Sequence, residues 1–405
     1  MKSRFSLLLA ASALTWAGPA LAGIGDPIEI GEDATLDPII DLRLRYENVS
    51  QDNGAGDADA LTARLRLGAE LKASGFFLLA EGEGTLALSD DYNDTLPGNG
   101  VEPFSVVADP ENLELNRLQV GYMDGGNGVT IGRQRIILDN ARFVGNVGWR
   151  QNEQTFDAIR GQASLGPVKL DATYAISQRT IFGVDSPNAF FDGDIVLLNA
   201  GVDLAPVKLS GFAYLVDYDT RIAFSSQTYG LRATGSFPVG GGVSLNGSAS
   251  FATQSDLGMN PTGYTAEYLN AEAGIAVSGI SLNAGYEVLG SDDGMASFQT
   301  PLATLHAFNG WADVFLTTPA AGLQDIYFGG GYTFGASAPV PGLRFAITYH
   351  QFDSDFGSID YGTEVDALVG FKLGPVGMLV KYANYHTDGF GVDTEKVWIQ
   401  AGISF

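Results

Sequence analysis

The chain has 405 residues, no cysteine and a formal net charge of −25. Without cysteine, neither a disulfide framework nor a thiolate metal site can form. The strong negative charge argues against nucleic acid as a partner, because phosphates require a basic surface.

The first 22 residues have the pattern of a secretory signal peptide. Lys2 and Arg4 precede an apolar run over residues 5–16, and Pro19 to Ala22 offers small residues before a cleavage site at Gly23. An N-terminal anchor helix is the alternative, but the run is shorter than the roughly 20 residues that a membrane helix needs. After residue 22 no apolar run is long enough to span a membrane as a helix. The sequence therefore predicts export, with the mature chain in the periplasm, secreted, or threaded through the outer membrane as strands.

From residue 39 onward, apolar and polar residues alternate in segments of ten to fourteen residues. In residues 41–47, Leu42 and Leu44 point to one side while Arg43 and Arg45 point to the other. A period of two is typical of a strand with two different faces. The same alternation recurs in residues 61–72, 280–288, 343–350, 365–373 and 397–405.

The connections between these segments are alternately short and long. Eight short turns interleave with nine long polar loops, which gives about eighteen antiparallel strands. The short turns lie near residues 73–75, 125–127, 166–167, 205–206, 238–242, 278–279, 335–342 and 374–375. The long loops lie near residues 50–58, 89–112, 137–155, 178–193, 218–227, 253–263, 290–323, 353–362 and 387–395.

This rhythm is typical of outer-membrane barrels, which have short periplasmic turns, long extracellular loops and an even number of strands. A soluble sandwich would show turn signals every 8–12 residues without the long/short rhythm, and a propeller would show a fixed repeat. We therefore predict an all-β, transmembrane, antiparallel up-and-down barrel. The expected organisation is a signal peptide (1–22), a short periplasmic segment (23–38) and the barrel (39–405).

If the apolar face of each strand meets lipid, the charged face meets the lumen. The first two strands then place Arg43, Arg45, Arg64 and Arg66 on one patch of wall, where four guanidiniums would attract carboxylates, phosphates or sulfates. The alternative is that they pair with wall carboxylates in a structural ladder. Further inward arginines are predicted at Arg117, Arg160, Arg232 and Arg344.

Two of the long loops are rich in apolar side chains. Residues 137–155 contain Phe143 and Trp149, and residues 290–323 contain His306 and Trp311. Exposed apolar patches are a liability, so we expect both loops to fold into the barrel mouth and constrict it. A self-packed cap or a subunit contact is the alternative.

Catalytic and metal-binding motifs are missing from the sequence. The three histidines have no ligand spacing, and the acidic run Ser89–Asp94 could hold calcium but lacks the order of a calcium loop and is more simply a solvated loop. The sequence predicts no enzyme, no cofactor and no metal.

Two loop motifs resemble the alginate-export family of outer-membrane porins. The first runs from Gly132-Arg133-Gln134-Arg135 to Thr155-Phe156-Asp157, and the second from Pro301-Leu302-Ala303-Thr304-Leu305-His306 to Gly322-Leu323-Gln324-Asp325. The resemblance implies an eighteen-stranded monomeric barrel with inward loops and an arginine-lined conduit for an anionic polysaccharide. Arg133 and Arg135 lie in the matched motif and become candidates for that lining. The C-terminal strand, which ends at Phe405, resembles the signal that barrel-assembly machinery reads.

The sequence thus predicts a passive channel in the outer membrane of a Gram-negative bacterium, for a polar, anionic saccharide. The alternatives are a general diffusion porin without a chosen substrate and a structural or adhesive barrel. Expected partners are outer-membrane lipid and lipopolysaccharide, the barrel-assembly machinery and an anionic polysaccharide or small anion.

Overall fold

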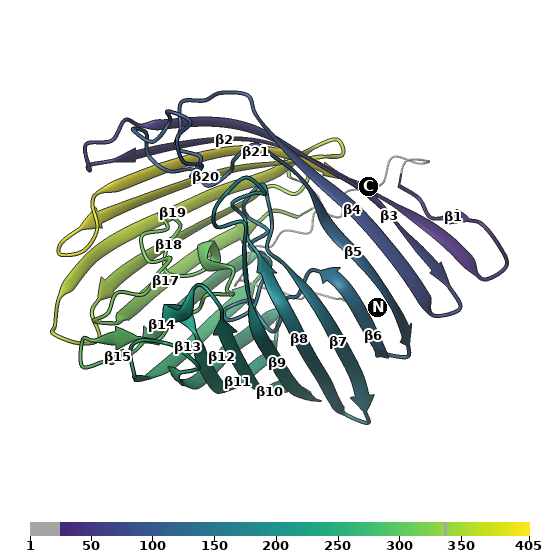
Figure 1. Cartoon of the computed structure of the whole chain (residues 1–405). Helices are drawn as coiled ribbons and strands as arrows, with labels where there is room; N and C mark the ends of the chain where they lie inside the picture. The colour runs from purple at the N-terminus through teal and green to yellow at the C-terminus, as the bar shows by residue number, and fades with distance from the viewer. Residues whose placement is uncertain (1–24, 336–337) are drawn as a thin grey trace.

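The computed structural model describes residues 25–335 and 338–405, and the predicted signal peptide lies outside them. Within these residues, eighteen long strands form one antiparallel sheet that closes on itself (Figure 1). Closure results from pairing of the first long strand, β2 (Ala34–Gln51), with the last, β21 (Thr394–Ser404), over the register Asp41↔Ser404 to Gln51↔Thr394. The predicted closed barrel of about eighteen strands is confirmed.

The strands between these two follow in chain order, each paired with the next. They are β3 (Ala58–Ala73), β4 (Phe76–Ala87), β5 (Asn112–Asp124), β6 (Asn127–Gln134), β7 (Thr155–Leu165), β8 (Val168–Arg179), β9 (Phe190–Leu204), β10 (Val207–Tyr218), β11 (Ser226–Gly240), β12 (Val243–Asp256), β13 (Thr265–Val277), β14 (Ile280–Leu289), β17 (Leu323–Thr333), β18 (Arg344–Asp353), β19 (Asp360–Leu373) and β20 (Val376–Thr387). The small elements are β1 (Ile28–Glu29), β15 (Ser291–Asp292), β16 (Ala296–Ser297) and the 3₁₀ turns η1 (Ile222–Phe224) and η2 (Leu305–Ala307). No helix in the described part of the chain is long and apolar enough to cross a membrane.

Short turns gather at one end of the barrel and long loops at the other. Most short turns contain only two residues between strands, as at Ser74-Gly75, where both residues have positive φ (49° and 87°). A left-handed backbone at both central positions is what a tight hairpin between right-twisted strands requires. The alternation read from the sequence is therefore present in the structure.

The two faces of the wall separate as the alternation predicts. On β3, Leu65 and Leu67 are 41% and 58% exposed on the outer face. Arg64, on the same strand but on the inner face, is 2% exposed. A charged side chain on the lipid face would cost about 2–4 kcal/mol at mid-membrane. The charges of these strands therefore lie inside, and leucine, isoleucine, phenylalanine and tyrosine dominate the outer face.

The barrel begins earlier than predicted. The first long strand starts at Ala34 and not at residue 39, and Asp37 and Pro38 pair with Glu70 and Ala69 of β3. The proline and the acidic residues interrupt the apolar pattern and suggested a separate segment. In the structure the Asp37 carboxylate is paired with Lys72 at 2.7 Å. An acidic residue can therefore be accommodated near the short-turn end of the barrel.

Candidate functional site

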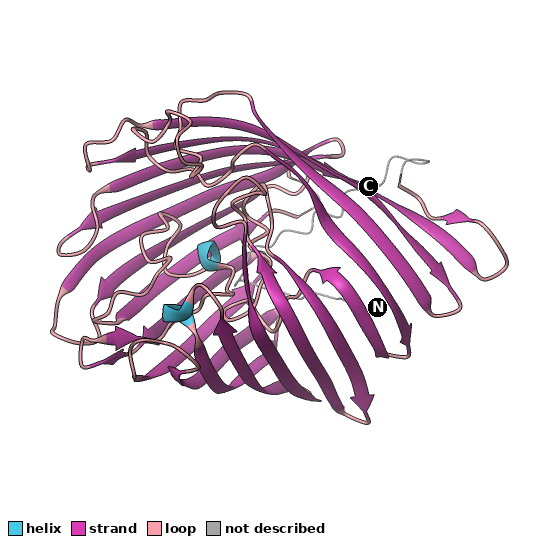
Figure 2. Ribbon diagram, in the orientation of Figure 1, coloured by secondary structure: helices cyan, strands magenta, loops and turns pink. Residues whose placement is uncertain are grey.

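Two long loops turn into the barrel and fill much of its inside. We call residues 135–154, between β6 and β7, the first inner loop, and residues 290–322, between β14 and β17, the second inner loop. Figure 2 shows loops and a short helical turn crossing the space that the strands enclose. The Phe143 ring lies 4.9 Å from Phe212 and 5.0 Å from Tyr268, both on the wall. The structure thus places both apolar loops inside the barrel.

The inner loops also bind each other. The Gly145 amide donates to the carbonyl oxygen of Leu302 at 2.8 Å, and the Gln154 side chain donates to the same oxygen at 2.8 Å. Phe298 and Leu302 are 0% and 2% exposed. Together the loops form an apolar core inside the barrel, which is an arrangement that a simple open pore would not need.

The backbone of the first inner loop covers the predicted arginine patch. The Arg43 guanidinium donates to the carbonyl oxygens of Gly148, Trp149 and Arg150 at 3.2, 3.0 and 3.1 Å. Arg45 donates to the Trp149 carbonyl as well, and its guanidinium carbon lies 4.1 Å from the centre of the Trp149 ring. These two arginines hold a loop in place and do not face open solvent.

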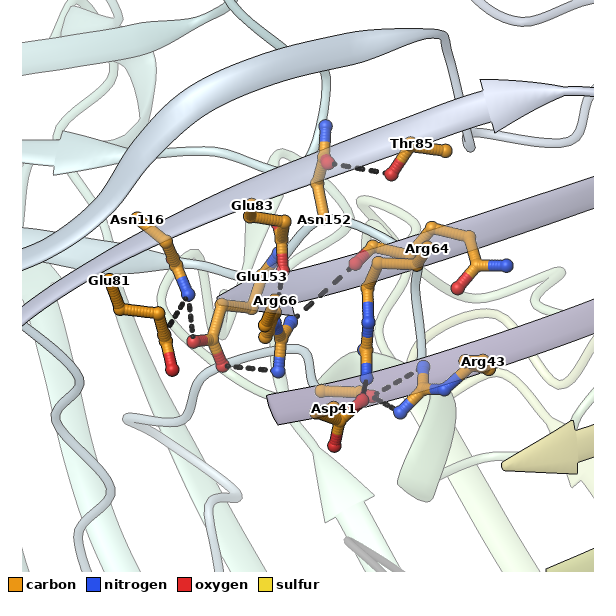
Figure 3. A network of polar contacts seen from close by, with 12 residues as sticks. Asp41, Arg43, Arg64, Arg66, Glu81, Glu83, Thr85, Asn116, Asn152 and Glu153 are labelled. Atoms are coloured by element: carbon orange, nitrogen blue, oxygen red, sulfur yellow. Dashed lines mark hydrogen bonds and ion pairs between the residues drawn. The ribbon is translucent and has the colours of Figure 1, made fainter. Parts of the chain in front are cut away.

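The other two arginines of the patch are paired with carboxylates (Figure 3). Arg64 forms an ion pair with Asp41, and Arg66 forms one with Glu83 on the neighbouring strand. Arg117 contacts Glu81 at 2.7 Å. The structural ladder is therefore the reading that the structure shows for Arg64 and Arg66, whereas Arg43 and Arg45 bind the first inner loop.

Glu153 of the first inner loop extends this ladder into the lumen. Its carboxylate contacts Arg135 and lies 3.6 Å from Arg66, and it accepts hydrogen bonds from Asn116 (2.7 Å) and Asn146 (2.8 Å). Burial raises the pKa of the Glu153 carboxyl, but Arg135 and Arg66 outweigh it and hold that pKa well below 4.5. The loop therefore brings its own negative charge to neutralise the arginines of the wall.

Arg133 lies on the opposite face from the one predicted. It pairs across the sheet with Leu118, which is 45% exposed on the outer face, and with Asp157, whose carboxylate it contacts at 2.8 Å. Residues directly opposite each other in a sheet share a face. Gln134, the next residue, takes the inward position and is 2% exposed, so Arg133 does not line the interior.

A cage of aromatic rings fixes the second inner loop to the wall. The Lys381 ammonium of β20 lies 4.1 Å from the Trp149 ring and 3.6 Å from the Trp311 ring, and the Trp149 and His306 rings stack at 4.5 Å. An ammonium over an indole face is attracted by the ring's quadrupole. The cage thus joins both inner loops to one strand.

His306 completes the cage as a neutral side chain. Its Nε2 lies 2.7 Å from the Lys381 ammonium, which can only donate, and its Nδ1 lies 2.8 Å from Asp313. A histidine that accepts at one nitrogen and donates at the other carries one proton. Burial, aided by the charge of Lys381, lowers the pKa of His306 well below 6.5 and outweighs Asp313, which raises it.

Arg142 links both inner loops to the wall. Its guanidinium contacts both oxygens of Glu287 on β14 (2.8 and 3.1 Å), Asn309 of the second inner loop (3.0 Å) and Thr300 (3.3 Å). Sequence reasoning missed this residue. A charge inside an apolar loop that enters a barrel must find a partner on the wall, and this rule could have identified Arg142.

Two neighbouring cavities lie inside the barrel, toward the end with the short turns. The first, of about 360 Å³, lies against β11 to β19 and is bordered by Arg344 and by the side chains of Glu272 and Tyr327. The second, of about 660 Å³, lies against β5 to β11 and is bordered by Arg160, which contacts Asp171 at 2.6 Å. Of all the residues around them, Asn140 and Arg232 line both.

Apart from Arg133, which faces outward, the residues predicted to line or constrict the lumen divide into three groups. Arg43, Arg45, Arg64, Arg66, Arg117 and Arg135 hold the inner loops or pair with carboxylates. Arg160, Arg232 and Arg344 border the open cavities. Phe143, Trp149, His306 and Trp311 belong to the packed inner loops.

Comparison with known proteins agrees with this geometry. Residues 36–186 match the model of the alginate export family. The resemblance read from the loop motifs is confirmed over this range, which includes the first inner loop and the arginine-bearing strands β2 to β7. A comparison with curated protein sequences gives no match.

Solved structures of outer-membrane porins share the fold at low sequence identity. OccK9 (OpdG) of Pseudomonas aeruginosa is 17% identical with a TM-score of 0.72, over 92% of this chain and 99% of that one. OccAB3 of Acinetobacter baumannii is 13% identical with a TM-score of 0.70, over 91% and 99%. OpdK of P. aeruginosa, solved with vanillate, is 12% identical with a TM-score of 0.72, over 91% and 98%. The chain therefore shares the barrel fold of these porins.

Proposed function

We propose that this protein is a passive outer-membrane channel whose substrates are small, polar, anionic saccharides. The observation that carries the proposal is the pair of cavities, each with charged side chains in its lining, inside a closed barrel whose outer face is apolar. A barrel that served only as an anchor or adhesin would gain nothing from open space with charged walls in its lumen. The porin architecture of the solved structures supports the same role.

The inner loops favour a selective channel over a general diffusion porin. They fill the lumen with packed aromatic rings and ion pairs, so only the space beside them is left for a solute. Asparagine and tyrosine side chains around the first cavity, such as Asn270, Asn283 and Tyr327, offer hydrogen-bonding partners for hydroxyl groups. Weak binding at several such groups suits a conductor, since a channel must also release what it binds.

We further propose that the protein acts as a monomer in contact with lipid and lipopolysaccharide, placed there by the barrel-assembly machinery after removal of residues 1–22. In this orientation the short turns face the periplasm. The two cavities then form the periplasmic half of the channel.

Recording from planar lipid bilayers tests the channel. Refolded protein should give discrete, ohmic conductance, and a KCl gradient should give a reversal potential that indicates preference for chloride. Galacturonate should reduce the current more than galactose at equal concentration. If correctly folded protein gives no conductance, and a variant with a loosened inner loop (Arg142→Met) also gives none, the channel proposal is wrong.

A further inference from the structure

The two cavities meet at one charged side chain. Arg232 of β11 and Asn140 of the first inner loop are the residues that border both spaces. Arg232 projects from the wall, and Asn140 projects from the loop. A solute in either cavity can therefore meet these two side chains.

The charge of Arg232 is not cancelled by an ion pair. Its guanidinium donates to the Ser250 hydroxyl at 2.9 Å, and no carboxylate of residues 25–335 and 338–405 lies within 4.0 Å of it. Arg160 in the second cavity differs, because two of its three guanidinium nitrogens contact Asp171. Glu272 on β13 is near enough to attract Arg232 but lies beyond ion-pair distance, so the guanidinium keeps donor nitrogens for a solute.

Asn140 is held at the border of the two cavities by its neighbour in the loop. The Asp139 carboxylate accepts hydrogen bonds from Asn199 of β9 (2.9 Å) and Ser210 of β10 (3.0 Å), and Asp139 adopts a left-handed backbone with φ 49°. These contacts tie the loop to the wall next to β11. Asn140 therefore forms a fixed border and can donate and accept hydrogen bonds with hydroxyl groups.

We infer that Arg232 is the specificity-determining residue of the channel, binding the carboxylate of a hydroxylated acid while Asn140 contacts its hydroxyls. The inference rests on the proposed channel function. A guanidinium can hold both oxygens of a carboxylate at once, which an ammonium cannot do. The volumes of the cavities, about 360 and 660 Å³, fall in the range of sites that hold small molecules. Arg232 would then select the solute, and the arginine patch on β2 and β3 would not. The patch arginines already bind carbonyl oxygens of the first inner loop or carboxylates of the wall.

The experiment measures selectivity and block for four proteins in planar bilayers. These are the wild type, Arg232→Gln, Arg232→Lys, and a control in which the ion pair on the outer face is removed by Arg133→Gln together with Asp157→Asn. Galacturonate is the anionic probe and galactose the neutral one. The control removes an arginine without altering the lumen or the net charge.

We expect Arg232→Gln to lose the preference for chloride and to weaken block by galacturonate about tenfold or more, with little change for galactose. Arg232→Lys should keep the chloride preference but bind galacturonate more weakly than the wild type, because the two-point contact is lost. The control should behave as the wild type. Unchanged selectivity and unchanged block in a conducting Arg232→Gln variant would overturn the inference.

Equilibrium binding separates this inference from the channel proposal. Calorimetry with galacturonate on folded protein in detergent needs no conductance. Binding to the wild type that Arg232→Gln removes supports the inference even if no current is found. Equal binding of galacturonate to both proteins, or binding to neither, contradicts the inference. If both proteins conduct and the Arg232→Gln substitution changes nothing, the inference about Arg232 is wrong but the channel proposal stands.

Discussion

Replacing Arg142 by methionine should release the inner loops from the wall. Arg142 is 2% exposed and makes two contacts with Glu287, at 2.8 and 3.1 Å, while also contacting Asn309 and Thr300 of the second inner loop. Methionine fills much of the same space but carries no charge. The change therefore removes one guanidinium that joins two loops and one strand.

The size of the effect follows from the charge that is left behind. Breaking a buried ion pair by removing one partner costs about 3–5 kcal/mol, because the other charge stays buried. Glu287 keeps hydrogen bonds from Tyr268 (2.6 Å) and Asn309 (2.7 Å), so we expect the lower end, about 3 kcal/mol. That value corresponds to a change of roughly 150-fold in the ratio of docked to displaced loops. Adding Glu287→Gln to Arg142→Met should recover part of the loss, since no buried charge then remains.

Loop displacement can be measured directly because the chain contains no cysteine. A single Ala303→Cys, at a position that is 1% exposed in the second inner loop, reports displacement through its rate of reaction with a maleimide. Arg142→Met should raise this rate by about two orders of magnitude and should increase single-channel conductance. Removing the outer-face pair of Arg133 and Asp157 should change neither. If the labelling rate and conductance of Arg142→Met equal those of that control, Arg142 does not hold the loops.

Three further changes probe other parts of the molecule. The docked His306 has a pKa well below 6.5 and displaced His306 the ordinary value, so docking is stable above pH 6.5 and weakens as pH falls below it. The labelling rate of Ala303→Cys, divided by that of a free thiol at the same pH because only the thiolate reacts, should therefore rise between pH 7 and 5. His306→Gln, which keeps one donor and one acceptor beside Asp313 and Lys381, should flatten the rise. Leu67→Arg, at the middle of β3, should lower the free energy of unfolding by about 2–4 kcal/mol, measured by urea unfolding from vesicles. Thr234→Arg, whose side chain faces the lumen, should cost much less. Equal losses would contradict the assignment of Leu67 to the lipid face and Thr234 to the lumen. Deleting Phe405 should reduce the amount of barrel in the outer membrane of a Gram-negative host without slowing refolding into detergent. Slower refolding would instead indicate a structural role for the backbone pairing between Phe405 and Ile40.

The barrel itself could be predicted because its cause is local. Each strand must show lipid an apolar side chain at every second position, and residues such as Leu42 and Leu44 carry that information directly. The two-residue turns are equally local, since Ser74-Gly75 and Gly125-Gly126 supply the positive φ that hairpins need. The start of β2 was placed too late because Pro38 breaks the pattern without breaking the strand.

The partners of the arginines could not be predicted in the same way. Arg43 is held by carbonyl oxygens about a hundred positions away in the chain, and every residue has a carbonyl. Barrel closure, however, could have been used to predict one set of partners, those on the last strand. Because the last strand must lie beside the first, Gln400 and Trp398 had to face Arg45 and Glu47, and Gln400 does accept a hydrogen bond from Arg45 at 2.7 Å.

The acidity of the whole chain does not conflict with selection of anions. Arg232 lies six residues from Ser226, the first residue of β11 at the long-loop end, which is about 20 Å along a strand. Charges in solvent are screened over about 8 Å at physiological salt, so the acidic loops at that end act only weakly on a solute beside Arg232. Inside the barrel, water is replaced by protein on most sides and a single charge acts more strongly. Selectivity is therefore decided by which lumen charges are left unpaired and not by the net charge of −25.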